Sequence, residues 1–201
     1  MGAKKGRPPM PAAAPIPSPR ALAAVALQQL RRAADARRRD YLAGYAPTRL
    51  RTLGAAGAAI GVAVRALRAA LRRRPAADVL ATARALCHTR VFEACLAAYL
   101  VLDHRADAHD ALGVRELPAL APALDNWVSV DTFGVCVAGQ AWRRGRLTDD
   151  DVHGWARSPD RWRRRLALVC TVALNQRSHG GAGDVPRTLA VAETAVADRD
   201  D

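Results

Sequence analysis

The stretch AAGAAIGVAVRALRAALRRR, residues 55–74, indicates the fold class of this chain. Apolar residues recur in it at intervals of four, three and four, a spacing that puts them on one face of an α-helix. These residues are Ile60, Val64, Leu67 and Leu71. A proline directly after the stretch ends the pattern, because proline disrupts a continuing helix. The stretch therefore predicts an amphipathic helix that buries one face.

The rest of the chain repeats this pattern without any segment typical of a strand. Half of its 201 residues are apolar, only 4% are aromatic, and alanine, leucine and arginine dominate, so helix propensity prevails. We expect further helices at 21–42 (introduced by Ser18 and Pro19), 76–86, 91–103, 117–124, 127–142, 149–156, 159–174 and 187–198. Short successive helices predict an all-α solenoid, although no strict repeat period is present.

The formal net charge of +12 favours a polyanionic partner, of which nucleic acid is the commonest large example. Lys4 and Lys5 are the only lysines, so 29 of the 31 basic residues are arginine (31 minus 2). A bias in nucleotide composition would give the same excess of arginine. The positions of the arginines are therefore more informative than their number.

The first residues differ in composition from the remainder. Residues 1–19 are basic and then rich in proline and alanine, which predicts a disordered tail before one domain at 20–201. The chain has no uncharged apolar stretch of about 18 residues, so we expect no membrane span.

The cysteines and histidines predict no metal or cofactor site. No two cysteines have the CxxC spacing, and each lies in or beside an apolar helical segment, where a thiol acts as a small hydrophobic group. They are Cys87, Cys95, Cys136 and Cys170. Buried free thiols are typical of a reducing compartment, so we expect a cytoplasmic protein.

The stretch DNWVSVDTFGVCVAG, residues 125–139, contains Trp127 and Asp131 at the start of a predicted helix. Residues four apart share a helix face, so the two side chains project side by side. Two interpretations remain open at this point. Trp127 and Asp131 form part of a functional site, or Asp131 and Ser129 only stabilise the start of the helix by capping it.

The stretch SPDRWRRRLALV, residues 158–169, begins a later helix with Ser158 as the expected cap. The buried face is expected to consist of Trp162, Leu166, Val169 and Ala173. Arg165 lies at the edge of that face, and the neighbouring arginines are expected to point toward solvent. Arg165 alone is therefore predicted to link the packed surface to a groove.

The other large aromatic residues are assigned to packing. Trp142 and Trp155 are expected in the core, because the chain has few aromatic residues to fill it. Tyr41 and Tyr45 are expected to pack the first turn of the chain.

The order W-x-x-x-D (Trp127 to Asp131) and then W-x-x-R (Trp162 to Arg165) resembles the DNA alkylation repair family of HEAT-like-repeat DNA glycosylases. The flanking sequences YLAGYAPTRLRTLG upstream and WARSPDRWRRRLALVCTVAL around the second motif also fit this resemblance, which covers roughly residues 21–201.

The resemblance implies a HEAT-like superhelix whose basic concave groove holds duplex DNA, without a cofactor. It also implies an enzyme that releases N3- and N7-alkylated purines without drawing the lesion into a deep pocket. By motif match, Asp131 is the catalytic carboxylate, Trp127 and Trp162 line the lesion site, and Arg165 contacts the DNA. The expected location is the cytoplasm, associated with the nucleoid.

Family members usually continue into a further helix that carries another aromatic residue of the site. We therefore expect a domain truncated at its C-terminal end, with the apolar face of the last helix exposed and prone to self-association. Two other functions remain open. One is a DNA-binding protein without base release, and the other is a protein-interaction scaffold, since a fold does not determine a function.

Overall fold

The computed structural model describes residues 16–200, and over that range the protein is built from helices and connecting loops. The α-helices are α1 (Pro19–Arg32), α2 (Ala36–Tyr45), α3 (Gly57–Leu71), α4 (Ala76–His88), α5 (Phe92–Leu102), α6 (Ala106–Asp110), α7 (Leu117–Leu120), α8 (Trp127–Phe133), α9 (Gly139–Arg143), α10 (Asp149–Ala156), α11 (Arg161–Asn175) and α12 (Val185–Ala195). A π-helical turn, η1 (Gly134–Ala138), joins α8 to α9, and a 3-10 turn, η2 (Arg177–His179), follows α11. No strand forms within residues 16–200, so the predicted all-α class is confirmed.

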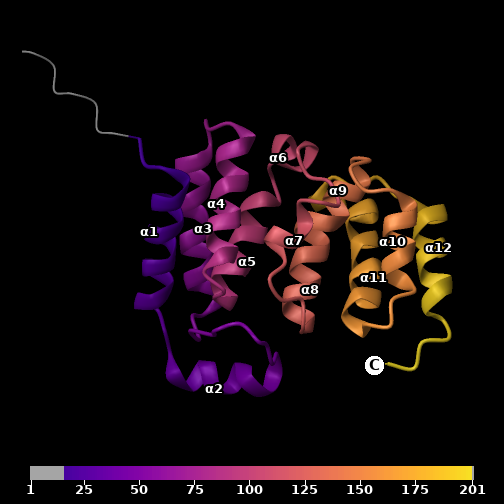
Figure 1. Ribbon diagram of the computed structural model, residues 1–201, viewed down its shortest axis with the longest axis horizontal. Helices are drawn as coiled ribbons and strands as arrows, with labels where there is room; N and C mark the ends of the chain where they lie inside the picture. The colour runs from indigo at the N-terminus through magenta and orange to yellow at the C-terminus, as the bar shows by residue number, and fades with distance from the viewer. Residues whose placement is uncertain (1–15, 201) are drawn as a thin grey trace, which may run out of the picture.

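The helices lie side by side in a row that runs from α1 at one end to α12 at the other (Figure 1). Contacts between neighbours follow this order, with α4 packed on α1 and α5, and α11 packed on α8, α10 and α12. One core runs through the row, and a contact between the Tyr99 and Phe133 rings, 5.1 Å between centroids, links α5 to α8. Trp142 is fully buried and Trp155 is half-buried against the core, as predicted.

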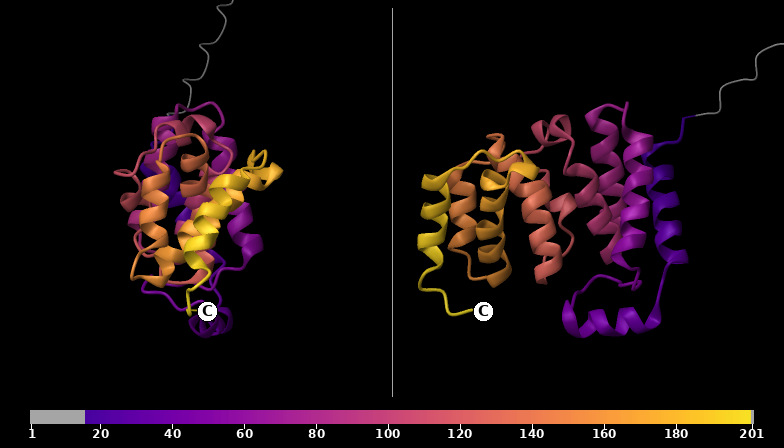
Figure 2. Two further views of the ribbon diagram at one scale, coloured as in Figure 1. Left: turned by 90° about the vertical axis from the view of Figure 1, so that its right-hand side faces the viewer. Right: turned by 180° about the vertical axis from the view of Figure 1, so that it is seen from behind.

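The predicted helix 21–42 is wrong, because the chain breaks after Arg32 and turns into α2. The carboxylate of Asp35 accepts a hydrogen bond from the Arg38 N–H (3.0 Å) and so begins a new helix as its N-cap. The Asp35 N–H donates to the carbonyl of Leu53 instead of continuing α1. As a result, α2 lies across the ends of the helices in the N-terminal half of the row (Figure 1, Figure 2).

The loop between α2 and α3 is anchored on α5 by a buried carboxylate. Glu93 is fully buried and accepts hydrogen bonds from the backbone N–H groups of Leu53 (3.0 Å), Gly54 (2.7 Å) and Ala55 (3.2 Å). Gly54 has a φ of 81°, and a Cβ there would lie 2.1 Å from the Asp35 carbonyl oxygen. The loop therefore requires glycine at this position, and Glu93 fixes α2 relative to the helix row.

The start of α1 agrees with the sequence, since Ser18 accepts a hydrogen bond from the Ala21 N–H (3.2 Å) and Pro19 begins the helix. Residues 1–15 of the predicted tail lie outside the described residues. The predicted helix 187–198 is found as α12. Its Val191 is buried, whereas Leu189 and Val196 are 52% and 84% exposed, so part of its apolar surface lacks cover within residues 16–200.

The cysteines are free and buried, as predicted. Burial raises the pKa of Cys136 and of Cys170 well above the ordinary range of a thiol, so both thiols stay protonated. Between residues 16 and 200, no helix combines the length and the apolar character that crossing a membrane requires.

Candidate functional site

Asp131 of α8 and Arg165 of α11 form a two-pronged ion pair. Arg165 Nε donates to Asp131 Oδ1 and Arg165 Nη2 donates to Asp131 Oδ2, each at 2.6 Å. The side chains are 32% exposed for Asp131 and 42% exposed for Arg165, so the pair lies at the surface. The hydrogen bond to Asp131 raises the pKa of Arg165, which keeps the guanidinium charged. Two residues 34 positions apart in sequence thus form one charged unit.

The start of α8 tests the capping interpretation of Asp131. Asn126 is the N-cap, and its side-chain oxygen accepts a hydrogen bond from the Ser129 N–H (3.0 Å). Asp131 lies in the next turn and bonds to Arg165 rather than to the free backbone amides. The capping interpretation of Asp131 is therefore wrong.

Two glycines that follow α8, at the starts of η1 and α9, allow this part of the chain to approach α11 closely. A Cβ on Gly134 would lie 2.8 Å from Val169 Cγ1, and a Cβ on Gly139 would lie 2.7 Å from the Cys170 carbonyl oxygen. Both distances are below ordinary van der Waals contact. Gly134 is the first residue of the π-helical turn η1 and Gly139 directly follows it, and such turns are often found beside functional sites.

Trp127 forms an aromatic surface with α2. The residue is 37% exposed, and its Nε1–H donates to the Tyr45 carbonyl oxygen at 3.2 Å. The Tyr45 ring meets Trp127 edge to face at 5.1 Å between centroids, and Tyr41 stacks on Tyr45 at 5.2 Å. The expectation that both tyrosines pack the first turn is wrong, because they are largely exposed and extend the surface beside Trp127. Their spacing of four residues on one helix was the available signal.

Trp162 is half-buried beside the ion pair, and the Arg161 guanidinium lies 4.8 Å from the centre of its ring. A hollow of about 360 Å³ opens there, and it is lined by Trp127, Arg161, Trp162, Arg165, Leu168, Asp198 and Asp200. Trp162 also lines a second hollow of about 380 Å³, together with Arg49, Phe133, Trp155 and Arg163. The structure thus brings Trp127, Trp162 and Arg165 together, with Asp131 bonded to Arg165.

The predicted orientation of the other arginines on α11 is wrong for Arg164. Its side chain is only 17% exposed, less than that of Arg165. Nη1 donates to the carbonyl oxygens of Ser158 (2.9 Å) and Pro159 (3.0 Å), and Nε donates to Asp198 Oδ2 (2.5 Å). The helix also begins later than predicted, since Asp160 and not Ser158 is the N-cap.

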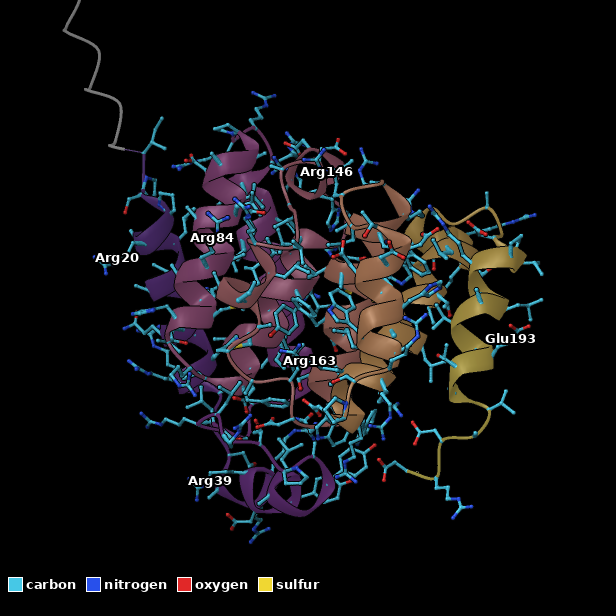
Figure 3. All side chains as sticks on the ribbon, turned by 45° about the vertical axis from the view of Figure 1, so that its right-hand side comes forward. Arg20, Arg39, Arg84, Arg146, Arg163 and Glu193 are labelled. Carbon is cyan, nitrogen blue, oxygen red and sulfur yellow. The ribbon has the colours of Figure 1, made fainter. Side chains whose placement is uncertain are left out.

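Positive charge is not restricted to this site. Figure 3 shows Arg20 and Arg84 toward the α1 end of the molecule, Arg39 on α2 at the bottom, and Arg146 at the top edge, opposite α2. Within residues 16–200, no group of three or more His, Cys, Asp or Glu side chains is arranged to hold a metal ion.

Comparison with known proteins gives one match for this chain. The family model for the DNA alkylation repair enzyme matches residues 26–201, which is well over half of the chain. No curated protein and no solved structure matches significantly. The matched range includes α8 and α11 and therefore all four site residues predicted from the sequence. On the extent of this match, the chain belongs to the DNA alkylation repair enzyme family.

Proposed function

We propose that this protein is a DNA glycosylase that releases cationic N3- and N7-alkylated purines from duplex DNA. The observation that carries the proposal is the Asp131–Arg165 pair beside an open hollow that Trp127 and Trp162 line. Family membership supports repair of alkylated DNA. The proposal adds the reaction, the class of lesion and the residues that act.

The chemistry requires little beyond a well-placed carboxylate. Alkylation at N3 or N7 gives the purine a positive charge, so it leaves as a neutral base when the C1′–N bond breaks and takes the bonding electron pair. The sugar then resembles an oxocarbenium ion, and water adds at C1′ with loss of a proton. A carboxylate about 4 Å away, at an effective dielectric near 20, stabilises this charge by roughly 4 kcal/mol, or about a thousandfold in rate.

Asp131 is proposed to supply this carboxylate and to orient the attacking water. Each carboxylate oxygen has two acceptor positions, so both oxygens still accept further hydrogen bonds while they are bound to Arg165. The positive charge of Arg165 opposes the stabilisation of the sugar, so the full thousandfold is an upper limit. Arg165 therefore orients the carboxylate at some cost in electrostatic stabilisation.

Arg165 is also proposed to contact a DNA phosphate near the lesion. A guanidinium binds phosphate with the same two-pronged geometry that it uses for a carboxylate. The pair with Asp131 is partly exposed, and exposed ion pairs stabilise a protein by only about 0–1 kcal/mol. Replacing Asp131 by a phosphate as the partner of Arg165 therefore costs little free energy. Arrival of DNA would thus draw Arg165 toward phosphate and leave the Asp131 carboxylate less neutralised.

The aromatic side chains are proposed to bind the sugar or the exposed bases by stacking. Trp127 and Tyr45 form a partly exposed surface, and Trp162 forms the wall of an open hollow. Stacking of a base on an aromatic side chain contributes about 1–3 kcal/mol. An open surface of this kind suits recognition of a lesion that stays outside a deep pocket.

Binding of DNA without base release is the second candidate. Arg165 holds both oxygens of Asp131 in the free protein, and a carboxylate that remained paired would have little charge left for the sugar. This candidate and the first differ only in whether the base is released.

The test is incubation of the full chain with duplex DNA that contains 7-methylguanine, followed by measurement of abasic sites and of binding. Release above a buffer control supports the glycosylase, and binding that weakens steeply with salt supports phosphate contacts. Binding without release would favour the second candidate. Absence of binding at low salt would overturn both.

A further inference from the structure

The segment after α12 folds back onto α11 through two carboxylates. Arg164 Nε and Nη2 donate to Asp198 at 2.5 and 3.2 Å, and Nη2 also donates to Asp200. The hydrogen bond from Arg164 lowers the pKa of Asp198, so this carboxylate is ionised in neutral solution. Arg164 thus contacts Asp198 and Asp200, which follow it by 34 and 36 positions in the sequence.

These carboxylates lie in the candidate site and not beside it. Asp198 and Asp200 line the same hollow of about 360 Å³ as Trp127, Trp162 and Arg165. Arg161 and Arg165 of α11 line this hollow, and Arg164 lies behind the two aspartates that line it, so all three arginines have partners in the free protein. Arg161 lies over the Trp162 ring, Arg164 binds the two aspartates, and Arg165 binds Asp131.

The backbone holds Arg164 in position independently of the aspartates. Its Nη1 donates to the Ser158 and Pro159 carbonyl oxygens, at 2.9 and 3.0 Å, which fixes the plane of the guanidinium. The opposite edge, formed by Nε and Nη2, is the edge that Asp198 occupies. An arginine fixed in this way offers two parallel N–H groups, which bind a carboxylate or a phosphate with the same geometry.

We propose that Arg164 is a phosphate-binding residue of the DNA surface and that Asp198 and Asp200 occupy it until DNA displaces them. The inference rests on the proposed function, because it assumes that DNA enters this hollow. It adds to that function a binding residue outside the W-x-x-x-D and W-x-x-R motifs. It also adds an acidic segment that competes with DNA and so weakens binding to undamaged duplex.

The test is the double variant Asp198→Asn/Asp200→Asn in the full chain. An ion pair near the surface contributes about 1 kcal/mol, which is a factor of about five, so removing the competition should raise the affinity for undamaged duplex about fivefold at low salt. Both complexes contain the Arg164 contact once DNA has displaced the aspartates, so the slope of log affinity against log salt should become shallower, by about 0.9, only when Arg164 is replaced. Fluorescence anisotropy over a salt series measures both quantities.

The matched control is Asp150→Asn/Glu193→Gln, which removes the same charge from two exposed carboxylates away from the hollow (Glu193 is labelled in Figure 3). A second control combines the Asp198 and Asp200 changes with Arg164→Gln, which should abolish the gain. A gain in the first variant only supports the inference. An equal gain in the Asp150/Glu193 control, a gain that survives Arg164→Gln, or no gain would overturn it.

The two proposals fail in different ways. If the unaltered protein binds duplex and the Asp198/Asp200 variant binds no more tightly, only the inference fails. If none of these proteins binds duplex at low salt, the proposed function fails and the inference fails with it. Thermal melts of every variant establish that each one is folded.

Discussion

Asp131→Asn is the substitution that separates a catalytic carboxylate from a structural one. Asparagine keeps the size of the side chain but removes the charge that Arg165 binds. The pair is about one third exposed on the Asp131 side, so its loss should lower the free energy of unfolding by about 1 kcal/mol or less. For a chain of this size that corresponds to a fall in melting temperature of at most about 2–4 °C.

The effect on base release should be much larger than the effect on stability. Full loss of a charge acting at about 4 Å would cost up to a thousandfold, and the nearby Arg165 reduces that figure. We expect a loss of roughly a hundredfold in the single-turnover rate, similar to the removal of one group that stabilises transition-state charge. Binding to undamaged duplex should become slightly tighter, because Arg165 is freed for phosphate.

The assay is single-turnover release of 7-methylguanine, with Asp110→Asn as the control. Asp110 of α6 forms a pair of the same geometry with Arg144, the residue directly after α9, at 2.7 and 2.6 Å, and it does not line the hollow beside Arg165. This control should release the base at the unaltered rate. Unchanged release by a folded Asp131→Asn protein, or an equal loss in Asp110→Asn, would refute the catalytic assignment.

Three further outcomes are expected. Glu93→Gln should lower the free energy of unfolding by about 2–3 kcal/mol in urea titrations, because a fully buried carboxylate loses charged hydrogen bonds to backbone N–H groups, and unchanged stability would contradict its role as an anchor. Burial lowers the pKa of His109, so the unfolded chain binds more protons below about pH 6.5. The free energy of unfolding should therefore fall as the pH drops below about 6.5 toward the pKa of His109 in the folded protein, by at most about 1.4 kcal/mol per pH unit. Thermal melts from pH 7.5 to 5 should show a shallower fall for His109→Gln than for the unaltered protein. Val191→Ala should lower the free energy of unfolding by about 1.6 kcal/mol and speed amide hydrogen exchange across 185–195 without changing exchange in α8. Exchange rates that rise equally in both helices would contradict the view that Val191 holds α12 alone in place.

Periodicity predicted most of the helix row. The segments 76–86, 91–103 and 149–156 correspond to α4, α5 and α10 within two residues at each end, because each has a clear boundary. An apolar face marks α4 and α10, whereas α5 is buried on all sides. The break between α1 and α2 was missed because Asp35 is tolerated inside a helix and is also a good cap. Asp35 begins a new helix because its N–H donates to the Leu53 carbonyl, 18 positions away. A contact over that distance in sequence leaves no local pattern.

The candidate site was predicted in part for the same reason. The motifs identify Asp131 and Arg165, and the structure adds that their side chains are bonded to each other. The contact of Tyr45 with Trp127 depends on where α2 lies, and the cover of Arg164 depends on the return of the chain after α12. Both are products of tertiary packing between residues distant in sequence, so neither is visible in a single motif.

The π-helical turn η1 makes the site sensitive to the length of the chain as well as to its composition. A π turn corresponds to an α-helix that carries one additional residue, and successive residues of an α-helix are rotated by about 100°. Deletion of one residue within 134–138 would let the helix return to regular α geometry and would turn Asp131 by about that angle relative to α9. A relative with such a gap would retain Trp127, Asp131 and Arg165 in its sequence, yet its carboxylate would no longer face α11.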